Sequence, residues 1–352
     1  MGNVQINNYT YSHHELKDWG NKVLLKCGLN EEECEYILDV LIHSNLRGVD
    51  THGIIRIIDY ANRLIKSPRS KIDIVNETQT LTVIDGKNNP GPICASYAMK
   101  IAIKKARHFG CGVSSVRGSN HFSTAAYYSL LAVEQEMVGI TMSSSSPRIA
   151  PWGGLDAVIG NNPWSIAVPG YDFPIVLDMA NTIVAMGKIR TCMREGKPLE
   201  PGWAMDSQGN PTTDATEAFN GLLVPIGNYK GVGISIMVDL LSSAISQSIA
   251  FSNEVKRVED SEHPQNVSHI FIAFNISDMV DITLFKESMA KYTQTIKSVR
   301  RKEGCNEIFM PGEIEWRTEC DRRKSGIVLS DKAVSQLNNF ATQLGVSPLP
   351  IV

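Results

Sequence analysis

Two histidines and an arginine are the residues of this chain best suited to moving a proton on a small acid. The segment from Arg47 reads Arg-Gly-Val-Asp-Thr-His-Gly-Ile-Ile-Arg, so His52 lies four positions before Arg56; a second histidine, His121, follows in Gly-Ser-Asn-His-Phe-Ser. If the first segment is helical, His52 and Arg56 share one face, about 5–6 Å apart at Cβ. Imidazole exchanges a proton near neutral pH, and a guanidinium holds a carboxylate through two parallel hydrogen bonds. The pattern indicates a site for a small carboxylate substrate.

The same residue types also have structural roles. A single histidine can be a core or capping residue whose ring is satisfied by a backbone carbonyl. Arg56 could form a surface ion pair with Asp59 or Asp50. Such an exposed pair is worth only about 0–1 kcal/mol, so stability gives little reason to prefer arginine over lysine, whereas carboxylate binding does. A further histidine, His43, ends an amphipathic segment, and helix-end packing is at least as good an interpretation for it as cofactor contact.

The common nucleotide and nucleophile motifs are missing from the sequence. Gly110-Cys111-Gly112 lacks the third glycine of the dinucleotide fingerprint Gly-x-Gly-x-x-Gly, and Gly231-Val232-Gly233 has no glycine three residues on. The sequence also has neither a Walker loop nor a Gly-x-Ser-x-Gly elbow. A nucleotide site in this chain would need another architecture.

Composition narrows the class of protein. Apolar residues make up 43% of the 352 residues and charged residues 20%, as in ordinary globular proteins. A net charge of −3 gives no general attraction to phosphate backbones, so no nucleic-acid partner is expected. No apolar run reaches the roughly 18 residues of a membrane span, and there is no secretory signal pattern, so no membrane role is expected. Seven cysteines without a Cys-x-x-Cys pair are typical of free thiols in a reducing cytoplasm.

The hydrophobic pattern predicts an α/β protein with helical ends. Capping boxes at Ser12 and Asn30 begin two helices, and 54–64 makes a third. Strand-like runs then alternate with helices, and the chain returns to helices after Ile282. The predicted strands are 80–84, 111–116, 138–143, 157–168, 175–179 and 269–274, and the predicted helices are 92–109, 123–136, 231–248, 286–302 and 331–344. We therefore expect an α/β domain over 75–280 and a helical domain built from 1–74 with 281–352.

Eight short motifs, in order, resemble those of the malate/L-lactate dehydrogenase-like family, which also contains ureidoglycolate, sulfolactate and diketogulonate oxidoreductases. The resemblance covers about residues 12 to 330. It implies an NAD- or NADP-dependent oxidoreductase acting on a small 2-hydroxy or 2-keto acid such as malate, lactate or ureidoglycolate. It also implies a non-Rossmann, mixed-sheet cofactor domain with a separate helical domain, in a homodimer. The motifs are Arg47 to Gly53, Asn120 to Ser123, Ala150 to Gly154, Gly160 to Pro163, Leu177 to Ala180, Pro211 to Asp214, Tyr229 to Gly233 and Pro311 to Glu313.

The resemblance also suggests roles for individual residues. His121 looks like the family's acid/base histidine, and His52 matches the proton donor of another branch; we rank His121 first. Arg56 looks like the ligand of the substrate carboxylate, with Tyr60 one turn further on. Dinucleotide contacts are implied for Ser145, Asp178, Met179, Ala180, Lys230, Gly312 and Glu313. Thr51, Ser123 and Arg148 depart from the commoner family pattern, which leaves the substrate open because pocket residues set that choice.

Two other reactions are alternatives, besides a catalytically dead binding protein that keeps the cofactor pocket. The first is a cyclic imine acid reductase, acting on piperideine or pyrroline carboxylates by the same hydride chemistry. The second is a metal-dependent hydrolase with His43, His52 and His121 as ligands. No His-x-x-x-His or His-x-His spacing supports the metal site, so we expect no metal.

Overall fold

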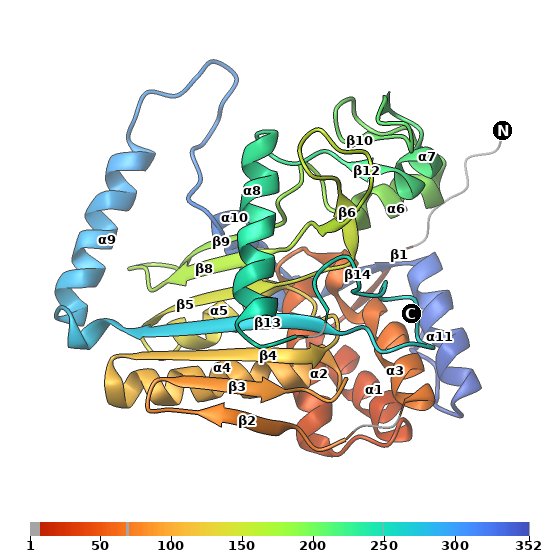
Figure 1. Ribbon diagram of the computed structural model, residues 1–352, viewed down its shortest axis with the longest axis horizontal. Coiled ribbons are helices and arrows are strands. Elements are labelled where there is room, and N and C mark those ends of the chain that lie inside the picture. The colour runs from red at the N-terminus through yellow and green to blue at the C-terminus, as the bar shows by residue number, and fades with distance from the viewer. Residues whose placement is uncertain (1–7, 68–69, 249, 352) are drawn as a thin grey trace.

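The computed structural model describes residues 8–67, 70–248 and 250–351 and is organised around one seven-stranded sheet (Figure 1). Only β3 and β4 run parallel; the other neighbouring pairs are antiparallel. The mixed α/β fold is confirmed, with no glycine-rich dinucleotide turn needed to build it. In spatial order the strands are β2 (Asp73–Glu77), β3 (Leu81–Asp85), β4 (Cys111–Ser119), β13 (Val267–Asn275), β5 (Met137–Ser143), β8 (Trp164–Val168) and β9 (Ile175–Met179).

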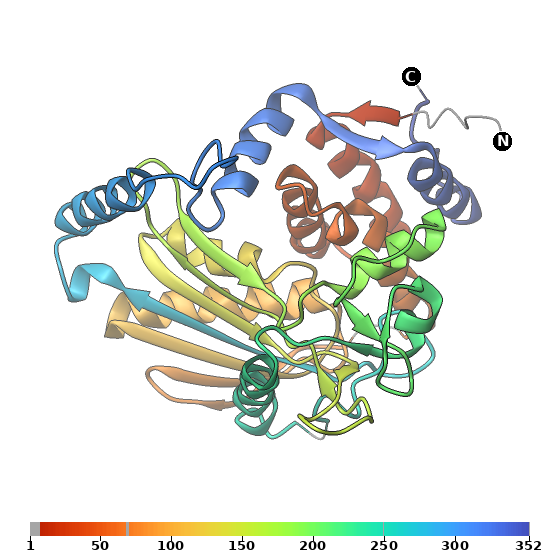
Figure 2. The same cartoon turned by 90° about the horizontal axis from the view of Figure 1, so that it is seen from above.

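Helices α4 (Gly91–Phe109) and α5 (Ala125–Val133) cover one face of the sheet. Glycines in the strands allow this close packing. A Cβ atom added at Gly112 would lie 2.0 Å from the Ala102 carbonyl oxygen, and one at Gly139 would lie 2.2 Å from that of Ser129. The opposite face carries α8 (Tyr229–Asp239), which continues into a π turn over Leu240–Ala244 (Figure 2).

The N-terminal and C-terminal segments share one apolar core. The predicted capping boxes are present: Ser12 begins α1 (His13–Lys26), and Asn30 begins α2 (Glu31–Leu46). The strand β1 (Asn8–Tyr11) pairs antiparallel with β14 (Ile327–Ser330), and α11 (Asp331–Gln343) packs beside them. Figure 1 shows these ends of the chain together with α3 (Ile57–Lys66) on one side of the sheet.

A smaller cluster lies beside the end of the sheet. It contains α6 (Met186–Glu195), α7 (Ala215–Asn220) and a three-stranded sheet of β11 (Pro211–Thr212), β10 (Ala204–Met205) and β12 (Leu222–Leu223). A short pair, β6 (Pro147–Ile149) and β7 (Ile159–Gly160), leads from the large sheet toward it. These segments position Arg148 and Arg190.

The helix α9 (Ile282–Lys297) projects away from the rest of the molecule (Figure 1). None of its 16 residues, all described, is buried. The chain returns through a loop to α10 (Glu313–Ser325), which contacts α2. Within the described residues, no helix is long and apolar enough to cross a membrane.

Most predicted elements are present, with local differences. The third helix begins only at Ile57, after two 3₁₀ turns. The apolar run 157–168 is divided between β7 and β8, because Asn161, Asn162 and Pro163 interrupt the pairing. The expected division at residues 74 and 281 stays a prediction; the segment 186–223 has a small apolar core of its own.

Candidate active site

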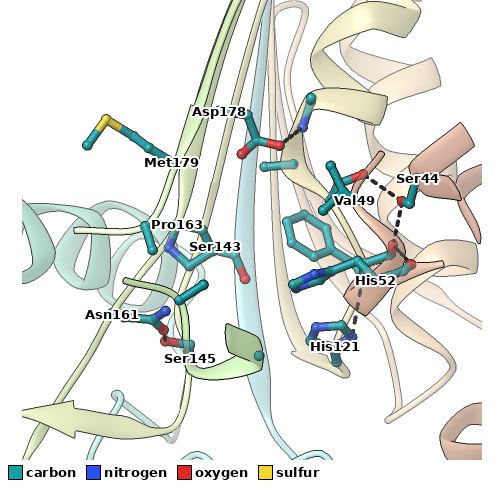
Figure 3. A pocket seen from close by; sticks show the side chains of 18 of the residues that line it. Ser44, Val49, His52, His121, Ser143, Ser145, Asn161, Pro163, Asp178 and Met179 are labelled. Atoms are coloured by element: carbon teal, nitrogen blue, oxygen red, sulfur yellow. Dashed lines mark hydrogen bonds between the residues drawn. The ribbon is translucent and has the colours of Figure 1, made fainter. Parts of the chain in front are cut away.

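The predicted catalytic residues meet at a cavity of about 430 Å³, within the size range of small-molecule sites. On one side lie the end of α2, the two 3₁₀ turns and the loop after β4; on the other lie the ends of β5 and β9. Figure 3 shows His52 and His121 on one wall and Ser145 and Asn161 on the other. The predicted site residues that line the cavity are His52, Arg56, His121, Ser145, Asp178, Met179, Ala180 and Gly312.

The backbone from Asp50 to Arg56 forms two 3₁₀ turns instead of one α-helix. The Asn45 side chain holds it: its amide donates to Asp50 (2.7 Å), and its carbonyl oxygen accepts from the Ile54 N–H (2.7 Å). Gly53 packs so closely that a Cβ atom there would lie 2.2 Å from Asn45 Oδ1. The expected helical register is therefore wrong, although His52 and Arg56 still line one cavity.

The two histidine rings lie face to face, with centroids 5.6 Å apart. His52 Nδ1 lies 3.0 Å from Thr51 Oγ1. His121 Nδ1 lies 3.0 Å from the Tyr60 hydroxyl. Ser123 connects the two, because its hydroxyl donates to the His52 carbonyl (2.7 Å) and its N–H donates to His121 Nδ1 (3.4 Å).

The Ser123 backbone is left-handed, with φ 72°, a conformation that costs a non-glycine residue about 1–2 kcal/mol. Its hydroxyl contacts with the His52 carbonyl and with Ser44 Oγ, 3.0 Å away, hold it there. A glycine at this position would adopt the turn without strain but would lose both contacts. The serine thus fixes the spacing of the two histidines.

Both histidines are neutral at pH 7. Burial, followed by the charges of Arg56 and Arg190, lowers the pKa of His52 to about 3. Burial and the same positive neighbourhood lower the pKa of His121 well below its ordinary value. The Ser123 N–H can only donate, so Nδ1 of neutral His121 is an acceptor and the ring proton sits on Nε2. A bound anion that offsets the arginines would raise both pKa values again.

Arg56 is partly engaged by the protein. Its Nε donates to the Thr51 carbonyl (2.8 Å), and its Nη1 donates to Asp59 (2.9 Å). The ion pair with Asp59, considered as an alternative to substrate binding, therefore exists beside the cavity. Among the described residues none accepts from Nη2. A substrate carboxylate could bind Nη2 directly but would share Nη1 with Asp59.

Tyr60 lies behind His121 and is only 4% exposed. Its hydroxyl contacts the imidazole. Tyr60 does not line the cavity wall. The geometry therefore fits a role in positioning His121 better than a role in binding substrate.

The cavity wall opposite the histidines has groups that suit a dinucleotide. Ser145 Oγ donates to Asn161 (2.8 Å) and accepts from the Asn162 N–H (3.1 Å), while Asp178 accepts from the Ala126 N–H (2.9 Å) at the start of α5. Gly312 has φ 79°, and a Cβ atom there would lie 2.8 Å from Val176 Cβ, so no side chain covers this part of the wall.

His43 also lines the cavity, a place the sequence left open. Its Nδ1 is buried and has no hydrogen-bond partner among the described residues. Burial lowers its pKa to about 3. An unsatisfied buried nitrogen beside a cradle of small residues fits a bound polar group, so the wall is compatible with a nicotinamide dinucleotide.

Two predicted cofactor residues lie outside the cavity. Glu313 is 1% exposed and forms ion pairs with Lys297 and Arg317, so it stabilises the start of α10. Lys230 lies on α8 beside an apolar depression that includes Trp164. The structure does not bring either side chain together with the other predicted residues.

Two arginines complete the wall. Arg148, on β6, and Arg190, on α6, line the cavity with Arg56. The sequence marks Arg148 only as a departure from the commoner family pattern, and no local pattern marks Arg190, whose place depends on how α6 packs. Among the described residues, no group of three histidine, cysteine or acidic side chains could hold a metal ion.

Comparisons with known proteins agree with this geometry. Residues 11–338 match the sequence family described as malate/L-lactate dehydrogenase. The chain is 37% identical over 339 residues to malate dehydrogenase from Pyrococcus horikoshii, covering 93% of each chain. It is 35% identical to L-sulfolactate dehydrogenase from Methanocaldococcus jannaschii, covering 92% and 94%. The crystal structure of malate dehydrogenase from Entamoeba histolytica superimposes with a TM-score of 0.92 at 32% identity, covering 98% of this chain and all of that one.

Proposed function

We propose that this chain, an oxidoreductase that belongs to the malate/L-lactate dehydrogenase family, transfers a hydride between a nicotinamide cofactor and C2 of a small 2-hydroxy or 2-keto acid. The convergence of His52, His121 and Arg56 on one cavity supports this activity most directly. A proton carrier and a carboxylate ligand are the two groups that such a reaction requires of the protein.

In the proposed reaction Arg56 holds the substrate carboxylate through Nη2, and the C2 oxygen lies against an imidazole. In the reduction His121 is the proton donor. It carries a proton on both ring nitrogens once the acid is bound, Nε2 gives its proton to the C2 oxygen, and the remaining proton stays on Nδ1 against the Tyr60 hydroxyl; oxidation is the reverse. The Tyr60 hydroxyl can donate or accept, so it can follow His121 through either protonation state. His52 stacks against the His121 ring and is the second candidate for the proton carrier.

The cofactor would be held by Ser145, by the strand end from Asp178 through Met179 to Ala180, and by the open wall at Gly312. NAD and NADP are both candidates. When bound, the nicotinamide ring supplies or accepts the hydride. The protein excludes water and fixes the substrate, so orientation is its main contribution.

A homodimer in a reducing cytoplasm is part of the proposal. The side chains of Leu284 and Tyr292 on α9 are 57% and 58% exposed, and such apolar side chains on a projecting helix are suited to covering by a second copy of the chain. The seven cysteines are all free, as expected for a reducing compartment. Sedimentation analysis of the chain and of a Leu284→Asp variant tests the dimer: the variant should be monomeric. A monomeric wild type would refute it.

The activity is tested by following oxidation of NADH and of NADPH against a panel of 2-keto acids and cyclic imino acids. We expect turnover with at least one 2-keto acid and loss of at least 100-fold in His121→Asn. Turnover restricted to cyclic imines would instead identify the imine reductase. Absence of any cofactor-dependent turnover, with His121→Asn indistinguishable from the wild type, would refute the proposed function.

A further inference from the structure

A buried arginine that forms no ion pair with any described carboxylate lies in the cavity wall. Arg148 is 4% exposed, and the hydrogen bond recorded for its guanidinium runs from Nη1 to the Phe219 carbonyl (3.3 Å). No ion pair joins it to a carboxylate within the described part of the chain. A buried cation is normally paired, because moving a charge out of water without a counterion is strongly unfavourable. Arg148 therefore has an unmet requirement for an anion.

Other arginines surround the same place. The guanidinium carbons of Arg148, Arg190 and Arg257 lie 5.5, 5.8 and 5.5 Å from the centre of the Phe219 ring. Arg190 forms an ion pair with Glu259, which is the carboxylate paired at this cluster. Burial, followed by the charges of Arg257 and Arg190, lowers the pKa of Arg148 to about 10, and the Glu259 carboxylate, which forms no ion pair with Arg148, offsets this only in part. Cation–π contact with Phe219 holds the guanidinium groups but does not neutralise them.

The cluster adjoins the proton-transfer groups. Arg148 and Arg190 line the same cavity as His52, His121 and Arg56. The positive charge of Arg190 acts on both histidines, on Arg56 and on Arg148, so the arginine cluster and the proton-transfer groups influence one another electrostatically. The cavity thus offers cations in two places, at Arg56 and at the pair Arg148 and Arg190.

We infer that Arg148, assisted by Arg190, binds a second acidic group at the far end of the substrate, so that the enzyme selects dianionic 2-hydroxy and 2-keto acids over monoanionic ones. This inference rests on the proposed function, in which Arg56 takes the carboxylate next to C2. The second group is a carboxylate or a sulfonate, since both present oxygens that a guanidinium binds. It supplies the anion that Arg148 lacks in the protein.

One matched substrate pair and a third compound test the inference. Oxaloacetate and 2-oxobutyrate differ by a carboxylate in place of a methyl group, and 3-sulfopyruvate tests a sulfonate. We expect the wild type to prefer the dianions by at least 100-fold in kcat/KM, because a site built for a charged group rejects an analogue that leaves it unpaired. In Arg148→Met this ratio should fall at least tenfold, and Arg148→Lys should recover part of it.

Arg257→Met is the matched control. Arg257 contacts the same Phe219 ring but does not line the cavity, so its loss should change the ratio less than threefold. If Arg148 only packed on Phe219, both variants would lower stability and leave the ratio alone, and that result would overturn the inference. An equal preference of the wild type for oxaloacetate and 2-oxobutyrate would also overturn it, whatever the folding of the variants.

A binding measurement separates this inference from the proposed activity. Calorimetry with succinate and butyrate, in the presence of NAD⁺ or NADP⁺, requires no turnover. Wild-type protein should bind succinate at least tenfold more tightly, and Arg148→Met should remove the difference. If no keto acid is reduced but succinate is still preferred, the reaction is wrong and the anion subsite stands. If keto acids are reduced and succinate has no advantage, the subsite is wrong and the reaction stands.

Discussion

The Tyr60 hydroxyl and Nδ1 of His121 are 3.0 Å apart, although 61 positions separate the two residues in the chain. Tyr60 is buried, so this contact is the one through which it reaches the cavity. In the proposed reaction the tyrosine orients the ring, since its hydroxyl can donate to Nδ1 or accept from it.

Removing this hydroxyl should impair chemistry more than binding. We expect Tyr60→Phe to lower kcat about tenfold with less than a threefold change in KM, and to alter the pH profile of kcat. Steady-state kinetics from pH 6 to 9 measure this. Tyr9→Phe, which removes an exposed hydroxyl at Asp331 far from the cavity, is the control. A profile identical to that of the wild type would assign Tyr60 to packing only.

The two histidines should differ in importance. His121→Asn should reduce kcat by about 10²–10⁴-fold, the usual contribution of a proton carrier, and His52→Asn by less. Asparagine keeps a polar group of similar size in each place. The comparison uses kcat at saturating substrate. If His52→Asn proves the more damaging, the two roles are reversed.

Arg56→Lys should raise KM about 10–100-fold for the 2-keto acid substrate. Lysine retains the charge but cannot contact Thr51, Asp59 and a carboxylate together as the guanidinium does. Initial rates over a range of substrate concentrations measure the change. Arg107→Lys, on the exposed end of α4, should behave as wild type. An unchanged KM for every 2-keto acid would remove Arg56 from the substrate site.

Gly53→Ala should disturb the 3₁₀ turns that carry His52 and Arg56. The added methyl would overlap Asn45 Oδ1, so we expect a loss of about 1–3 kcal/mol in the free energy of unfolding, together with lower activity. Urea unfolding provides the measurement. Gly233→Ala is the matched control, because a Cβ atom there meets nothing within 4 Å and alanine favours the α8 helix. Equal effects of the two changes would contradict the packing described for Asn45.

Buried His269 should make the protein less stable in acid. Burial lowers its pKa to about 3, whereas the unfolded chain keeps the ordinary value near 6.5. Between these values the unfolded state binds a proton that the native state does not, so stability falls as the pH falls. From pH 7 to pH 5 the loss for His269 is about 2 kcal/mol.

Urea unfolding at the two pH values tests this effect. His269→Asn should show a smaller loss between pH 7 and pH 5 than the wild type, even if it is less stable at both. The exposed His108→Asn should leave the loss unchanged. A wild type equally stable at both pH values, with an unaltered difference in His269→Asn, would show that the ring is protonated in the folded protein.

Local patterns were sufficient for much of the fold. The capping boxes at Ser12 and Asn30 and the alternation along β5 depend on neighbours in sequence, and these elements form as predicted. The predicted helices leave out α10, because Pro311-Gly312 favours a turn and one of the two ion-pair partners of Glu313, Lys297, belongs to another helix. The 3₁₀ turns after Asp50 depend on Asn45, which no periodicity indicates.

In the site, too, residues with distinctive local chemistry could be predicted and those placed by distant packing could not. His52, Arg56 and His121 could be proposed from residue type and resemblance, since each has distinctive chemistry. Arg190 could not, because its α6 helix reaches the cavity only through the packing of a separate apolar cluster. Lys230 was proposed from a motif, but its position on α8 depends on the sheet face that this helix covers.

The pairing of β1 with β14 has a consequence for synthesis on the ribosome. Trp19 Nε1 donates to the Ser347 carbonyl, 328 positions away, and the Tyr11 hydroxyl donates to that of Pro350, 339 positions away, so the first helices complete their core with residues translated much later. The nascent N-terminal segment must therefore wait until those residues have emerged, with its apolar side chains available to chaperones in the meantime. The central sheet, in contrast, can begin to assemble once β13 has emerged.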